Sequence, residues 1–71
     1  MERTAVRSRD LAVVGYDNEK ETLEVAFRSG GVYHYFKVPD NVYQELLQAP
    51  SMGIYFRDKI RDHYEYNKVS G

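Results

Sequence analysis

The nine residues from Gly31 to Pro39 limit the possible folds of this chain more than any other segment. Their centre carries four consecutive ring-bearing residues, Tyr33 to Phe36, and aromatic and β-branched side chains suit the pleated, half-buried surface of a β-strand. Two glycines typical of a tight turn precede these rings, whereas Pro39 lacks the backbone donor that a continuing strand would need. Because proline is also favoured in the first turn of a helix, the run is predicted to be the last strand of a small sheet and to lead into a helix.

Length and composition indicate one small domain without covalent cross-links. A chain of 71 residues can form a single core, and the absence of cysteine excludes disulfides and cysteine-based metal sites. Stability must therefore come from packed apolar side chains, above all seven tyrosines and three phenylalanines. We see no metal-ligand set and expect no cofactor. The uncharged run Leu11–Tyr16 is too short for a membrane span, so we expect a cytoplasmic protein without a membrane partner.

The N-terminal half is predicted to supply the rest of the sheet. Residues 1–9 are polar and lack apolar periodicity, and we interpret them as a flexible arm. Arg3, Arg7 and Arg9 are either solvated charge or a basic arm that contacts a polyanion, and the nearby acidic residues favour solvated charge. The apolar run Leu11–Tyr16 is the first predicted strand. Leu23–Arg28 alternates with a period of two, which indicates a second strand with one buried face. Its inward residues are Leu23, Val25 and Phe27, and its outward residues are Glu24, Ala26 and Arg28.

The length of the hairpin loop decides which rings are buried, because a slip of one residue moves every side chain to the other face. We favour a three-residue loop, Arg28 to Gly30. This register sets Tyr33 opposite Val25, Tyr35 opposite Leu23, Glu24 opposite His34 and Glu21 opposite Lys37. A two-residue loop would instead turn Val32, His34 and Phe36 toward the inward face of the second strand.

Two helices are predicted after Pro39. The segment Asp40–Ala49 carries one apolar stripe, which consists of Val42, Tyr43, Leu46 and Leu47. Pro50 ends this helix, and Ser51 is a favourable N-cap for a second helix from Met52 to about His63.

The predicted architecture is therefore α+β. A three-stranded antiparallel meander is followed by two helices that pack on one face of the sheet, in the order β-β-β-α-α. Tyr64 to Tyr66 runs back over the core, and residues 67–71 form a frayed end. The single domain spans residues 10–66.

Seven short motifs in one order resemble the KTSC domain family. They are Gly15-Tyr16-Asp17, Leu23-x-Val25-x-Phe27, Gly30-x-x-Tyr33-x-Tyr35, Val38-Pro39-x-x-Val42-Tyr43, Leu46-Leu47-x-Ala49, Ser51-x-Gly53-x-Tyr55-Phe56 and Ile60-Arg61. The resemblance covers roughly residues 8 to 66. The family is named for its occurrence at the C-terminus of some lysyl-tRNA synthetases, and it includes small stand-alone bacterial proteins.

The resemblance implies a non-catalytic module of uncharacterised function, with RNA binding suggested by the synthetase association and by a central Tyr-x-Tyr motif. In this chain the motif is Tyr33-His34-Tyr35. In the favoured register Tyr33 and Tyr35 belong to the core. A single-stranded RNA or tRNA would then bind the open face of the sheet, where Phe36 is the stacking platform, His34 lies beside it and Arg28 is near a phosphate. A net charge of -1 implies weak binding.

Two other function classes were weighed against RNA binding. An enzyme is disfavoured, because His34 and His63 lie on different elements and Asp58 and Asp62 are interleaved with basic residues, as on a solvated helix face. The alternative is a protein-interaction or regulatory module, which would use an exposed sheet edge to capture a partner strand or to form a homodimer.

Overall fold

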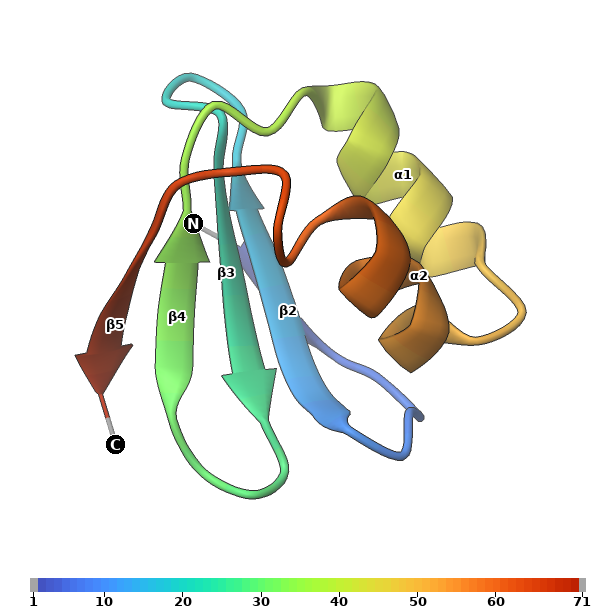
Figure 1. Ribbon diagram of the computed structural model, residues 1–71. Helices are drawn as coiled ribbons and strands as arrows, with labels where there is room; N and C mark the ends of the chain where they lie inside the picture. Colours follow the sequence, from blue (N-terminus) through green and yellow to red (C-terminus); the bar gives the residue numbers. More distant parts are fainter. Residues whose placement is uncertain (1, 71) are drawn as a thin grey trace.

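Five antiparallel strands and two helices make up the computed structural model, which describes residues 2–70 (Figure 1). The elements are β1 (Glu2–Ala5), β2 (Leu11–Asp17), β3 (Thr22–Phe27), β4 (Val32–Tyr35), α1 (Asp40–Gln48), α2 (Met52–Lys59) and β5 (Tyr66–Ser70). The strands lie in the sheet in their order along the chain, and both helices are inserted between β4 and β5. The α+β class and the two helices are as predicted. In Figure 1 the helices lie toward the β2 side of the sheet, and β4 and β5 extend beyond them.

The prediction of three strands was wrong, because the sheet has five. The additional strands are β1, within the predicted arm of residues 1–9, and β5, which begins at Tyr66 and includes most of the predicted frayed end. All nine residues of these two strands are exposed. A strand without a buried face does not need the apolar alternation by which strands are recognised in a sequence. They form because the edges of β2 and β4 offer unpaired backbone groups, which a local sequence pattern does not reveal. The run after Gly31 is consequently not the last strand of the sheet.

The predicted register of the central hairpin is confirmed. Tyr35 lies opposite Leu23, Tyr33 opposite Val25 and His34 opposite Glu24. The loop has three residues and is closed by a hydrogen bond from Phe27 N to Gly31 O of 3.1 Å. Gly30 and Gly31 have φ values of +105° and +93°, which explains the two glycines at this turn.

The predicted pair of Glu21 and Lys37 is not among the ion pairs of residues 2–70. Both residues lie just outside the ends of β3 and β4, and both have positive φ, +50° and +58°. The chain is instead joined here through the backbone, where Val38 N donates to Glu21 O over 2.9 Å. The antiparallel ladder ends at Tyr35, so its register does not extend to this pair.

The hydrophobic core lies between the sheet and the helices. Its buried members are Leu11, Val14, Leu23, Val25, Tyr35, Val38, Leu46, Phe56 and Ile60. The predicted stripe of the first helix packs here, with Leu46 fully buried and Val42, Tyr43 and Leu47 half-buried against the core. The Tyr16 and Tyr43 rings stack with centroids 4.9 Å apart, and the Tyr16 hydroxyl donates a hydrogen bond to Val38 O.

The second helix ends earlier than predicted, at Lys59 rather than near His63. Ile60 is fully buried and leaves helical geometry, with φ −120° and ψ −51°. The chain then turns back and reaches the sheet at Tyr66. The apolar spacing of the sequence would allow the helix to continue to His63. Burial of Ile60 and the return of the chain to the sheet end it at Lys59 instead. Within residues 2–70, neither helix has the length and apolar character needed to cross a membrane.

The start of α2 offers a test of its predicted cap. The Ser51 hydroxyl accepts a hydrogen bond from Ile54 N at 3.3 Å. Ser51→Ala is expected to lower the free energy of unfolding by about 0.5 to 2 kcal/mol, because an amide of the first turn loses its partner. Amide hydrogen exchange at Ile54 should accelerate. Ser29→Ala, at an exposed position of the hairpin loop, serves as the control, and unchanged exchange at Ile54 in the Ser51 variant would refute the cap.

Candidate functional site

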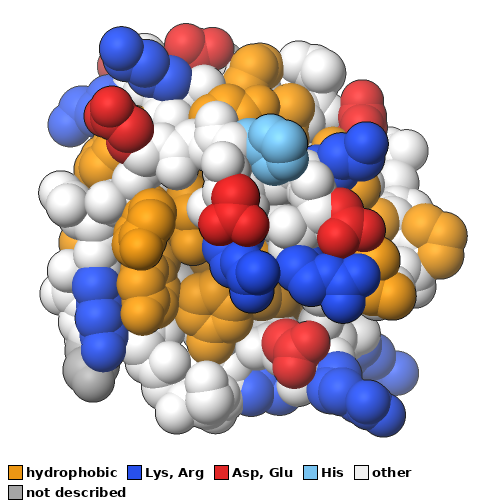
Figure 2. All heavy atoms as spheres, in the orientation of Figure 1, with side chains coloured by type: hydrophobic (Ala, Val, Ile, Leu, Met, Phe, Trp, Pro, Cys, Tyr) orange, Lys and Arg blue, Asp and Glu red, His pale blue; other side chains and the backbone are white. Residues whose placement is uncertain are grey.

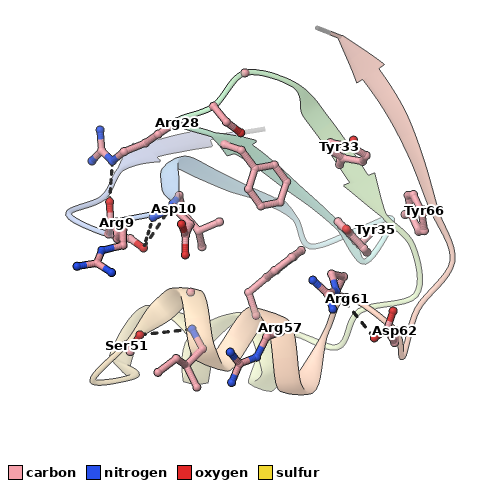
Figure 3. A pocket seen from close by; sticks show the side chains of 18 residues that line it. Arg9, Asp10, Arg28, Tyr33, Tyr35, Ser51, Arg57, Arg61, Asp62 and Tyr66 are labelled. Atoms are coloured by element: carbon pink, nitrogen blue, oxygen red, sulfur yellow. Dashed lines mark hydrogen bonds and ion pairs between the residues drawn. The ribbon is translucent and has the colours of Figure 1, made fainter.

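An open cleft with a volume of about 1050 Å³ separates part of the sheet from α2. The sheet contributes Phe27, Tyr33 and Tyr35, α2 contributes Phe56, and Tyr66 of β5 lies at the far end (Figure 3). Figure 2 shows apolar side chains exposed over the β4 and β5 side of the molecule, next to mixed basic and acidic side chains over α2. Aromatic rings thus line much of the cleft, and the helices do not cover them completely.

The aromatic residues along the cleft range from buried to accessible, and Tyr35 and Tyr66 are the two extremes. Tyr35 is 3% exposed, and its ring lies edge-on to Phe56 with centroids 5.2 Å apart. Tyr66 is 54% exposed and stacks on Tyr35 at 5.3 Å with an interplanar angle of 29°. It also lies 5.9 Å from half-buried Tyr33. Tyr66 therefore presents an accessible aromatic surface that its neighbours hold in place.

Burial affects the chemistry of the Tyr35 hydroxyl. Its removal from water raises the pKa of Tyr35 to about 12, and the neighbouring Tyr66 and Tyr33 add to this effect. The hydroxyl therefore remains protonated at neutral pH. It can donate a hydrogen bond, and it is not suited to act as a base.

Four arginines line the cleft, namely Arg9, Arg28, Arg57 and Arg61. Arg57 pairs with Asp58 at 3.0 Å and Arg61 with Asp62 at 3.8 Å, in both cases between exposed neighbours along the chain. Such surface pairs contribute little free energy, so both guanidinium groups can exchange their partner for a ligand anion.

Arg28 is held differently. Its Nε donates to Ser8 O at 2.6 Å and its Nη2 donates to Val6 O at 2.9 Å. These acceptors are neutral carbonyls, so they orient the guanidinium without cancelling its charge. The side chain joins the β3–β4 hairpin to the connection between β1 and β2.

The opposite face of the sheet carries a polar cluster of Arg3, Glu24 and His34. Glu24 is only 7% exposed, although it was correctly predicted to point outward. Both Nε and Nη2 of Arg3 donate to its carboxylate, the second at 3.2 Å, and His34 Nε2 lies 2.8 Å from Glu24 Oε1. Gly15 stands between Arg3 and Glu24 in the register, so the arginine reaches the carboxylate across a position of β2 that has no side chain.

This cluster keeps Glu24 charged. The hydrogen bonds from Arg3 and, to a smaller extent, His34 outweigh the opposing effect of burial and lower the pKa of Glu24 to about 2. The centre of the open face is therefore a carboxylate whose charge is balanced by its neighbours.

The five residues predicted to bind RNA do not lie together. Tyr33, Tyr35 and Arg28 line the cleft on the helix side. His34 lies on the opposite face beside Glu24, and half-buried Phe36 follows β4, where its N donates to Glu65 O at 2.9 Å. The structure thus divides the predicted set between two faces.

Sequence reasoning missed the cleft residues Tyr66, Arg57 and Arg61, and it interpreted Arg9 as solvated charge, with contact to a polyanion as the alternative. Only Tyr66 had a signal, because the segment that contains it was expected to run back over the core. The arginines lie in segments that resemble ordinary solvated surface, and only the fold places them around one cleft. Among residues 2–70, no group of three potential metal ligands is arranged to hold an ion.

Comparison with known proteins assigns the family. The sequence model of the KTSC domain family matches residues 7–64, which make up most of the chain. This protein belongs to the KTSC domain family. A crystal structure of a KTSC domain protein from Yersinia pestis has a TM-score of 0.93 and 32% sequence identity, and the match covers 96% of each chain. The resemblance of the seven sequence motifs is thereby confirmed.

The relatives of this KTSC domain protein include proteins of similar length and much longer ones. An uncharacterized protein from Stutzerimonas stutzeri is 43% identical over 70 residues, covering 97% of this chain and 99% of that protein. A lysine–tRNA ligase from Trichormus variabilis is 46% identical over 55 residues, which are 78% of this chain but only 10% of the ligase. A related segment therefore makes up nearly all of one small protein and a small part of a lysine–tRNA ligase.

Proposed function

We propose that this KTSC domain protein is a small, non-catalytic cytoplasmic module that binds single-stranded RNA in the cleft between α2 and the β4–β5 side of the sheet. The observation that carries the proposal is the accessible ring of Tyr66, which stacks on Tyr35. The arginines of the site line the same cleft. An unpaired base can stack on an accessible ring whatever its identity, and an arginine can contact a neighbouring phosphate. The site thus combines the two contacts that single-stranded RNA needs.

The relatives support an RNA ligand over other anions with flat rings. The name of the lysine–tRNA ligases states tRNA as their substrate, and they carry a segment related to this chain. We extend that association to a single-stranded RNA or an unpaired part of a tRNA. Because the net charge is -1 and the arginines of the cleft lie near the carboxylates of Asp10 and Asp62, affinity is expected in the range of about 10⁻⁴ to 10⁻⁶ M.

The proposed stacking contact is tested at Tyr66. Tyr66→Ala is expected to weaken binding of an octauridylate by about 1 to 3 kcal/mol, the usual contribution of one stacked base. The measurement is a chemical-shift titration at two salt concentrations. Val69→Ala is the matched control, because Val69 lies on the same strand, is 48% exposed and does not line the cleft.

A third variant distinguishes the two faces of the sheet. Phe36→Ala removes the ring that was predicted to stack on the open face beside His34, and Phe36 does not line the cleft. If Phe36→Ala weakens binding and Tyr66→Ala does not, the RNA lies on the open face. If the wild type shows no RNA-induced shifts at either salt concentration, RNA binding is wrong for both faces.

The sheet edges favour a second candidate, a protein-interaction or regulatory module. β1 and β5 form the two edges, and every residue of both strands is exposed. Their unpaired backbone groups can accept a strand from a partner protein or from a second copy of the chain. Salt separates the two candidates, because phosphate contacts weaken steeply as salt rises and strand addition does not.

A further inference from the structure

The two ends of the cleft differ in chemistry. The accessible ring of Tyr66 and the rings of Tyr33 and Tyr35 lie at the end formed by β4 and β5. Arg9 and Arg28 lie at the other end, beside the connection between β1 and β2 (Figure 3). One end therefore suits a base, and the other suits a phosphate.

The positive charge at the second end is less neutralised than elsewhere in the cleft. Arg9 forms no ion pair within the part of the chain from residue 2 to residue 70. Among the residues that the structure describes, the Arg28 side chain donates only to the carbonyls of Val6 and Ser8. By contrast, Arg57 and Arg61 each have an aspartate partner next to them in the sequence.

One carboxylate also lies at this end, that of Asp10. It packs against the first turn of α2, so closely that a Cβ built on Gly53 would lie 2.9 Å from Asp10 Oδ2. The positive end of the helix dipole offsets part of the charge of a carboxylate in this position. A phosphate beside Arg9 and Arg28 would consequently meet less repulsion than the charge of Asp10 alone suggests.

The separation of the two ends across the sheet favours a ligand longer than one nucleotide. β2 and β5 are separated by three strand spacings, which amounts to roughly 14 Å across the sheet. The phosphate of a mononucleotide is attached to the sugar that carries its base, so we expect one nucleotide with its base on Tyr66 to leave its phosphate short of Arg9. A longer chain can satisfy both ends.

We propose that the cleft binds a segment of more than one nucleotide in one orientation, with a base stacked on Tyr66 and the phosphate of a different nucleotide between Arg9 and Arg28. This inference rests on the proposed RNA-binding function. It adds a length requirement and names Arg9 as a phosphate-binding residue. The path between the two ends runs across the strands, along the wall formed by Phe27 and Phe56.

A length series tests the inference with the full chain. Uridine monophosphate and oligouridylates of two, four and eight nucleotides are titrated into wild type, Arg9→Ala and Arg7→Ala while chemical shifts are recorded. Arg7 is the matched control, because its replacement changes the net charge equally and its side chain does not line the cleft. Arg9→Ala is expected to weaken tetranucleotide binding about two- to fivefold and to leave the affinity for uridine monophosphate unchanged.

Salt dependence provides a second readout. Loss of one phosphate contact should reduce the slope of log K against log salt by about 0.7 for the tetranucleotide in Arg9→Ala, with no change in Arg7→Ala. An equal effect of Arg9→Ala on the monophosphate and the tetranucleotide, an equal effect of Arg7→Ala, or no effect of Arg9→Ala would overturn the inference and leave RNA binding standing. Absence of wild-type binding to every ligand in the series would refute the proposed function itself.

Discussion

Tyr35→Ala is expected to lower the free energy of unfolding by about 3 to 5 kcal/mol, the usual loss when a buried ring is removed. Tyr35 is 3% exposed, stacks against Tyr66 and lies edge-on to Phe56, so its truncation leaves a cavity between the sheet and α2. A domain of this size has a total stability of about 4 to 10 kcal/mol, so the variant should be close to unfolding. Urea denaturation monitored by circular dichroism measures the loss.

Tyr66→Ala is the matched control for this prediction, because it removes the same side chain from a 54% exposed position of the same cluster. It should cost about 1 kcal/mol. Equal losses for the two variants, or an unchanged denaturation midpoint for Tyr35→Ala, would contradict the central place of Tyr35 in the core.

Glu24→Gln is expected to lower stability by about 1.5 to 3 kcal/mol at pH 7, since it removes the charge from a carboxylate that accepts hydrogen bonds from a charged partner. The acceptor is buried, whereas the side chain of Arg3 is 56% exposed and that of His34 is 27% exposed. Partial exposure of these partners keeps the loss below that of a fully buried ion pair.

The pH dependence of this difference has a defined sign. The pKa of Glu24 is lowered from 4.5 to about 2 in the folded protein, chiefly by Arg3, so the unfolded chain takes up its proton first as the pH falls. The contribution of the charged carboxylate is complete above about pH 5 and disappears toward pH 2. The stability gap between wild type and Glu24→Gln should therefore narrow over that range.

Thermal denaturation of both proteins at pH 7, 4 and 2.5 measures the gap. Glu19→Gln, at an exposed position of the turn between β2 and β3, is the control with the same change in charge. A gap that stays constant down to pH 2.5 would show that the carboxylate of Glu24 acts through its shape and not through its charge.

Much of the fold follows from local patterns in the sequence. Alternation in Leu23–Arg28, the glycines of the hairpin loop and the rings after them predicted β3, β4 and their register, because period, turn chemistry and burial all agree there. Pro39, Pro50 and Ser51 marked where the helices begin and where the first ends. These signals are encoded by residues close together in the chain.

The edge strands and the cleft depend on contacts between distant segments. β1 and β5 form through backbone hydrogen bonds to the edges of β2 and β4. Because a polar sequence can make such bonds, the pattern of side chains does not predict these two strands. The same holds for Glu24, which is buried because Arg3 reaches it across Gly15.

The candidate site divides in the same way. The sequence by itself determined the Tyr-x-Tyr motif and the face on which Tyr33 and Tyr35 lie, because strand alternation and loop length set the direction of each side chain. Only the tertiary structure decided that Tyr66 and Arg9, 57 residues apart in the chain, lie in one cleft with those rings. The physical reason is that the early end of α2 and the pairing of β5 with β4 bring the C-terminal segment back across the sheet, and both depend on long-range packing.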